Sequence, residues 1–131
     1  MSGRYERGLA QLAKLNGSAG VAVIDTLREI APDFARYLVE FIFGDLYARP
    51  GLDLRTRQIV TVAALAAMGT AQPQLEIHVQ GALNAGLSRD EIVEILSQIA
   101  AYAGFPAALN ALAAARRVFE RESDSSLSPD R

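Results

Sequence analysis

The chain of 131 residues fits one folded domain, and its 13 basic and 15 acidic residues give a formal net charge of −2. No basic run or stripe stands out, so nucleic-acid binding is not expected. The chain has no cysteine and one histidine, which excludes disulfides, thiolate chemistry, zinc–thiolate sites and a metal site built from several histidines.

The N-terminal segment is too polar for a signal peptide, and no apolar run reaches membrane-spanning length. We therefore expect a cytoplasmic protein without a membrane segment. Hydrophobic residues make up 50% of the chain, but aromatic residues only 7%. This composition favours an all-α fold of closely packed helices. It also exceeds what one small core can bury, so we expect a homo-oligomer.

Helical periodicity and capping residues predict about six to seven helices, over residues 4–15, 18–30, 32–48, 54–68, 74–85, 88–103 and 106–121. Asn16 and Gly17 form a C-cap pair that separates the first two, and Ser88 and Glu91 match a capping box. Residues 1–122 are expected to form a single helical domain, and the polar tail at 123–131 is expected to be disordered.

Two of these helices have distinctive apolar patterns. In the helix at 32–48, Phe34, Leu38, Phe41 and Asp45 are predicted to share one face. The helix at 54–68 is apolar around nearly its whole circumference, which predicts that it is buried on all sides.

His78 is the residue from which any proton-transfer hypothesis must start, because no other side chain has an unperturbed pKa near neutrality. On a helical wheel, it lies at the edge of a buried stripe that contains Leu75, Val79 and Ala82, with Glu76 on the opposite edge. A half-buried imidazole can serve a cleft, or it can make one hydrogen bond at a helix interface. Spacing alone leaves both interpretations open.

Arginines cluster around the loop that leads into the apolar helix. Arg49 lies in this loop, whereas Arg57 lies on the helix itself, where its guanidinium needs a partner. That partner is either Glu40 or Asp45, or else a substrate carboxylate, which the planar guanidinium fork matches equally well. For Glu40, a pairing with Arg36 four residues earlier is the simplest explanation.

Five segments of the chain read GDLYARPGL at 44–52, RTR at 55–57, LEIH at 75–78, GLSRDEI at 86–92 and AYAGFPAA at 101–108. Together they resemble the carboxymuconolactone decarboxylase family. The similarity covers roughly residues 36–115. The wider family includes AhpD-like thiol peroxidases, which have a C-x-x-C pair before the histidine and a glutamate where this chain has Gln58. Because both cysteines are missing, the resemblance is to the cysteine-free decarboxylase branch.

The resemblance implies an AhpD-like helical fold, a homotrimer or homohexamer, and a lyase that needs no metal or cofactor. The implied reaction converts 4-carboxymuconolactone to the 3-oxoadipate enol-lactone in aromatic-compound breakdown. Arg49 or Arg57 would bind the small carboxylate or lactone substrate, and His78 would act as hydrogen-bond donor or acid. Glu40, Asp45 and Glu76 would support them. The alternative from another class is a non-catalytic helical oligomer that binds a small acidic ligand or partner.

Overall fold

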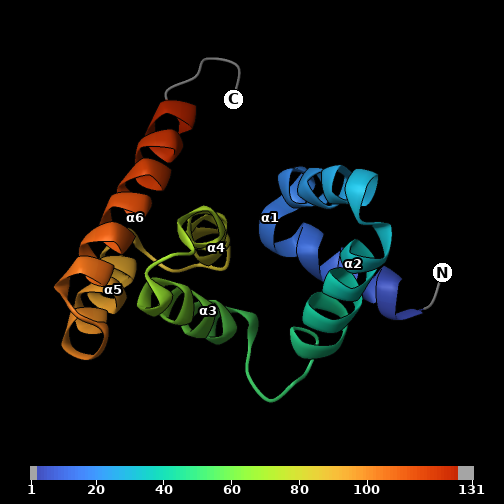
Figure 1. The fold of residues 1–131 in the computed structure, drawn as a ribbon, viewed down its shortest axis with the longest axis horizontal. Helices are drawn as coiled ribbons and strands as arrows, with labels where there is room; N and C mark the ends of the chain where they lie inside the picture. Colours follow the sequence, from blue (N-terminus) through green and yellow to red (C-terminus); the bar gives the residue numbers. More distant parts are fainter. Residues whose placement is uncertain (1–2, 127–131) are drawn as a thin grey trace. The chain divides into compact units, whose positions relative to one another are not determined.

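A computed structural model describes residues 3–126 of the chain. This part contains helices and no strand, which confirms the all-α prediction (Figure 1). The elements are α1 (Gly3–Ile30), α2 (Pro32–Tyr37), the π-helical segment η1 (Leu38–Leu46), α3 (Leu54–Met68), α4 (Gln72–Asn84), α5 (Arg89–Ala103) and α6 (Phe105–Ser126). They form two compact units, Met1–Leu54 and Arg55–Arg131, which are described here separately. The single domain expected over residues 1–122 stays a prediction.

The first unit is built on a kinked α1. Gly17 has φ 60° and ψ −148°, so the helix changes direction at this residue. A positive φ is costly for residues with a Cβ and readily adopted by glycine. The break predicted at Asn16 and Gly17 is therefore confirmed, as a kink within one helix.

Two glycines allow α1 to pack directly on the backbone of η1. A Cβ added at Gly8 would lie 2.2 Å from the carbonyl oxygen of Val39, and one added at Gly44 would lie 2.4 Å from that of Arg4. Both distances are too short for any side chain. The contact between the two elements thus depends on the absence of a Cβ at each position.

The helix predicted at 32–48 differs from expectation in its hydrogen-bonding type. It begins as α2 and continues as η1, where the bond from the Tyr47 amide to the Ile42 carbonyl spans five residues. Ala35, Val39 and Phe43 are buried. Phe34 and Phe41, which the sequence places on one face with Leu38 and Asp45, are 59% and 55% exposed, so this face is not the one packed in the core.

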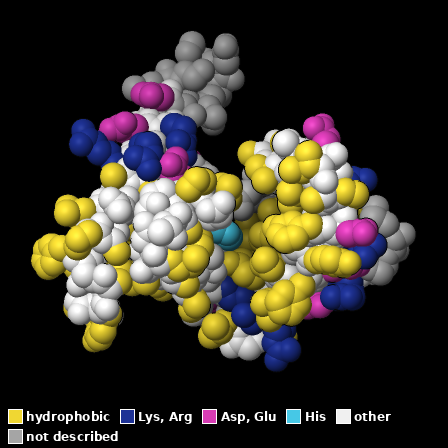
Figure 2. All heavy atoms as spheres, viewed as in Figure 1, with side chains coloured by type: hydrophobic (Ala, Val, Ile, Leu, Met, Phe, Trp, Pro, Cys, Tyr) yellow, Lys and Arg dark blue, Asp and Glu magenta, His cyan; other side chains and the backbone are white. Residues whose placement is uncertain are grey.

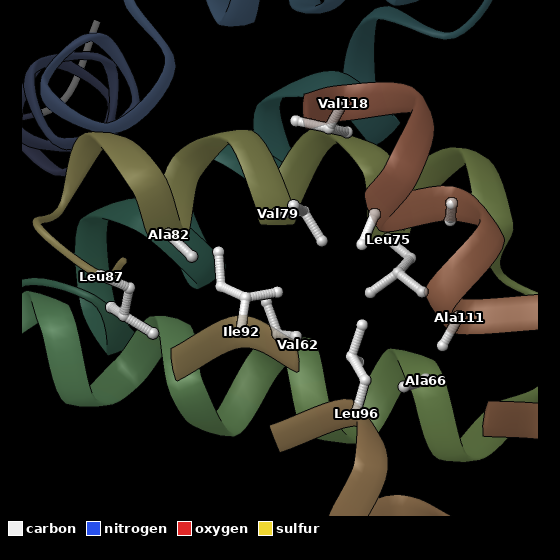
Figure 3. Packing of buried hydrophobic residues seen from close by; sticks show 12 residues of the cluster. Val62, Ala66, Leu75, Val79, Ala82, Leu87, Ile92, Leu96, Ala111 and Val118 are labelled. Atoms are coloured by element: carbon white, nitrogen blue, oxygen red, sulfur yellow. The ribbon is translucent and has the colours of Figure 1, made fainter. Parts of the chain in front are cut away.

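The second unit has a continuous apolar core formed by α3 to α6 (Figure 3). α6 packs against both α4 and α5. Figure 3 labels buried side chains from all four helices, which include Val62, Leu75, Ile92, Leu96 and Val118. All five are fully buried.

The expectation that α3 is buried on all sides was wrong. Only Gln58, Val62 and Ala66 are fully buried, whereas Val60 and Met68 are 55% and 61% exposed. The three buried positions are four residues apart, so a single stripe of the helix faces the core. Because the remaining surface is alanine-rich and apolar, its hydropathy did not reveal which face is inward.

The ends of α5 and α6 test two further predictions. The Ser88 hydroxyl accepts from the Glu91 amide at 3.0 Å, and the Glu91 carboxylate accepts from the Ser88 amide at 2.9 Å, which confirms the capping box.

α6 extends to Ser126, so residues 123–126 of the expected disordered tail are helical. Arg89 binds the Phe119 carbonyl and the Ser123 hydroxyl at 3.2 and 3.0 Å, which ties down this last part of the helix. Residues 127–131 lie outside the described part.

Large apolar side chains are exposed on both units, as the yellow surface in Figure 2 shows. The most exposed are Ile30 at 85%, Tyr102 at 87% and Phe105 at 72%. The surplus of apolar surface inferred from composition is therefore present, while the oligomer that would cover it stays a prediction. Among residues 3–126, no helix is both long enough and apolar enough to cross a membrane.

Candidate active site

His78 lies on α4 where the helical wheel predicts it. Leu75, Val79 and Ala82 are fully buried, and His78 stands beside them at the edge of the stripe, partly exposed. The neighbouring helices hold the α4 backbone through this stripe, so the position of the imidazole is fixed by the core of the second unit.

The imidazole contacts a buried amide from α3. Nδ1 of His78 lies 3.2 Å from Oε1 of Gln58, and Gln58 has no exposed surface. A polar side chain in an apolar core is costly without a hydrogen bond, so this contact stabilises both partners.

Sequence reasoning missed the contact with Gln58. Gln58 was considered only as the residue that replaces a peroxidase glutamate. The available signal was its spacing of four and eight residues from Val62 and Ala66, which places an amide on the buried stripe of α3.

Burial also changes the acid–base behaviour of His78. Loss of solvent around the ring lowers its pKa from 6.5 to about 4, because burial disfavours the charged form. In the free protein at neutral pH the imidazole is therefore neutral. It has one nitrogen that donates and one that accepts.

The two arginines expected to bind substrate occupy different surroundings. Arg57 is half-buried on α3, directly before Gln58 in the sequence, while Arg49 is exposed in the loop after η1. Arg49 belongs to the first unit, and Arg57 and His78 belong to the second. The substrate-binding role that the resemblance implies for Arg49 or Arg57 stays a prediction.

Glu40 and Asp45 have arginine partners within the first unit. Arg36 Nε lies 3.7 Å from Glu40 Oε1, which confirms the expected pairing. Asp45 accepts two hydrogen bonds from Arg4, at 3.1 and 2.7 Å, and lies 3.6 Å from Arg7. The Arg4 hydrogen bonds hold the pKa of the Asp45 carboxyl below its usual range. The partners of Asp45 precede it by about forty residues, so no local pattern predicted them.

Glu76 faces α6, where its two carboxylate oxygens accept hydrogen bonds from Arg117 and Arg121, each at 2.9 Å. Burial acts to raise the pKa of Glu76, but the hydrogen bonds from Arg121 and Arg117 outweigh it and the pKa is lowered. These contacts make Glu76 a link between α4 and α6.

No group of three or more histidine, cysteine, aspartate or glutamate side chains within residues 3–126 is arranged to hold a metal ion. The groups at hand for chemistry are the neutral imidazole of His78 and the Gln58 amide in contact with it.

Fold and site together define an all-helical protein with one histidine-centred site. Comparison with known proteins identifies the family. Residues 32–117 match the Carboxymuconolactone decarboxylase family, and the chain belongs to this family.

Three relatives extend this comparison. The chain is 32% identical to the 4-carboxymuconolactone decarboxylase of Acinetobacter baylyi over 129 residues, which cover 98% of this chain and 93% of the relative. It is 34% identical over 99 residues to a 15.0 kDa protein from the nqo9–nqo10 intergenic region of Paracoccus denitrificans, covering 75% of this chain and 74% of the relative. A nitrosuccinic acid decarboxylase of Metarhizium robertsii is 32% identical over 75 residues, covering 57% of this chain and 52% of the relative.

Proposed function

We propose that this protein is a cofactor-free decarboxylase of a small carboxylated lactone, of the 4-carboxymuconolactone type, in aromatic-compound breakdown. The near-full-length similarity to the Acinetobacter baylyi enzyme carries this proposal. A second relative with a different substrate in its name is also a decarboxylase, which supports the reaction type more strongly than the substrate.

The proposed reaction makes definite demands on the site. The departing carboxylate is vinylogous to the lactone carbonyl, so the electrons of the broken bond collect on the carbonyl oxygen as a dienolate. A cation must hold the remaining carboxylate of the substrate, and an acid must then protonate carbon. Each demand can be met by side chains of this chain.

His78 is the proposed acid. Its pKa of about 4 makes the protonated imidazole a strong proton donor, while the free protein holds the ring neutral. An anionic substrate beside the ring favours protonation, because opposite charges stabilise each other. A positioned general acid contributes about 10²- to 10⁴-fold to the rate.

Arg57 or Arg49 is the proposed cation for the substrate carboxylate. The guanidinium fork binds a carboxylate through two parallel hydrogen bonds. Glu40, Asp45 and Glu76 are proposed as supporting residues, which act by holding arginines of α2, α1 and α6.

Turnover of 4-carboxymuconolactone by the purified protein tests this function. We expect the absorbance of the enol-lactone to change with time, with the Acinetobacter baylyi enzyme as positive control. His78→Ala should lower kcat by about 10²- to 10⁴-fold in protein that is still folded. It should also lower the melting temperature, because the buried Gln58 amide loses its hydrogen-bond partner. An inactive wild type beside an active control would refute the substrate, and it would favour a non-catalytic protein that binds a small acidic ligand.

We also propose that the exposed apolar side chains are covered in a homotrimer or homohexamer. The support is their number and size on both units (Figure 2). Gel filtration with light scattering should give a mass well above the 14.1 kDa of one chain. A stable monomer at micromolar concentration would contradict the proposed assembly.

A further inference from the structure

The contact between His78 and Gln58 joins two helices whose positions are set by one core. Nδ1 of His78 and Oε1 of Gln58 are 3.2 Å apart, within hydrogen-bonding distance. Gln58 is fully buried on α3, and His78 stands at the edge of the buried stripe of α4. The Gln58 amide therefore has a fixed position, and its contact with Nδ1 orients the imidazole ring.

The amide is confined by its surroundings. A Cβ added at Gly81, one turn after His78 on α4, would lie 3.5 Å from each of the three terminal atoms Cδ, Nε2 and Oε1 of Gln58. The amide thus lies flat against the α4 backbone. Its Nε2 finds no hydrogen-bond partner within residues 3–126, so the contact with His78 is what orients the group.

We propose that Gln58 is a positioning residue that keeps a proton on Nδ1 of His78, so that Nε2 is the nitrogen that exchanges protons. The reason is the chemistry of the partner atom: a carbonyl oxygen only accepts hydrogen bonds, and Nδ1 must carry a hydrogen to donate to it. The tautomer is then set by the fold, before any substrate binds.

For catalysis, this inference rests on the proposed function. The bond between the ring carbon and the carboxylate breaks, carbon dioxide leaves, and the electron pair remains as the dienolate. The proton on Nε2 of His78 then forms the new C–H bond, while the other proton stays on Nδ1 and is donated in a hydrogen bond to Gln58 Oε1. The imidazole returns to its neutral form and Nε2 takes its next proton from solvent, so each turnover consumes one proton.

The tautomer can be measured without substrate, because the chain contains one histidine. In long-range ¹H–¹⁵N spectra of ¹⁵N-labelled protein, we expect a pyrrole-type resonance for Nδ1 and a pyridine-type resonance for Nε2. The opposite pattern would mean that the amide is turned and donates to Nδ1, and it would overturn the proposal.

Two variants at position 58 sharpen the test. Gln58→Met has a similar length but cannot accept this hydrogen bond, so we expect a mixture of the two tautomers. Gln58→Glu keeps an acceptor and should retain the Nδ1–H form, which also covers the case in which Gln58→Met fails to fold. An unchanged tautomer in folded Gln58→Met would overturn the proposal.

Gln80→Met is the matched control, since Gln80 also lies on α4 but its side chain binds Asn84 and Glu122. It should leave the tautomer unchanged. A tautomer shift in both methionine variants would indicate general loosening of the unit and would contradict a specific role for Gln58.

Kinetics then connect the tautomer to turnover of the lactone. We expect Gln58→Met to lower kcat by at least about tenfold, but less than His78→Ala, with little change in KM. The kcat of Gln58→Glu should lie between the values for Gln58→Met and wild type. If wild type does not turn over the lactone, the proposed function is refuted. The ¹H–¹⁵N spectra would still test whether Gln58 sets the tautomer of His78.

Discussion

The low pKa of His78 predicts that the free energy of unfolding depends on pH between about 4 and 6.5. In the unfolded chain the imidazole titrates near 6.5, and in the folded protein near 4. Between these values the unfolded chain binds the proton and the folded protein does not. Stability is therefore fully present above pH 6.5 and is lost as the pH falls toward 4.

The size of the effect follows from the same two values. One pKa unit corresponds to about 1.4 kcal/mol, so the full loss is about 3 kcal/mol, and about 2 kcal/mol is lost by about pH 5. The carboxyls with lowered pKa values, those of Asp45, Glu76 and Glu91, lose their contribution mainly at lower pH. Their contribution is common to wild type and to a His78 variant, so it cancels in a comparison.

The assay is urea unfolding of wild type and His78→Gln from pH 8 to pH 5 at one protein concentration. The concentration is held constant because subunit association would otherwise change the apparent stability. We expect the stability difference between the two proteins to shift by about 2 kcal/mol across this range, in the direction that favours the variant at low pH. A constant difference, or an NMR titration that gives His78 a pKa near 6.5, would refute the reasoning.

Three substitutions test the packing described above. Gly44→Ala should cost at least about 1–3 kcal/mol in urea unfolding, since its Cβ would meet a backbone carbonyl at 2.4 Å. Gly51→Ala, where a Cβ meets nothing within 4 Å, is the control, and equal losses would contradict the contact. Gly81→Ala should stabilise by about 0.5–1 kcal/mol, because alanine favours helices and its Cβ would make ordinary contact with Gln58. A loss of stability in Gly81→Ala would mean that the Gln58 amide cannot accommodate the added methyl group. Glu76→Gln should lower stability by about 1 kcal/mol at low salt and leave kcat within about twofold, whereas a large loss of kcat would show a direct role.

Local signals in the sequence were sufficient for the order of the helices and for several of their ends. The capping box at Ser88 and the kink at Gly17 both depend on residues a few positions apart. The same holds for the pairing of Arg36 with Glu40 across one helical turn. Such features follow from helical geometry alone, so they can be predicted without knowledge of tertiary structure.

The features that could not be predicted from the sequence depend on which helix faces pack against each other. The fully apolar pattern of α3 contains no information on which face is inward, so the burial of Gln58 was missed and that of Met68 was assumed. The hydrogen bonds of Asp45 with Arg4 and of Glu76 with Arg117 join positions about forty residues apart. The role of His78 was left open for the same reason, because its partner lies on another helix.

The backbone contact between α1 and η1 determines which truncated fragments of this protein can fold. The stretch shared with the family begins at residue 32, yet η1 lies against Gly8 and the carbonyl of Arg4. A fragment cut at the start of the shared stretch would leave the glycine-lined side of η1 bare and Asp45 without its arginines. The stretch that matches the family is therefore shorter than the length that must be kept together for this unit to fold.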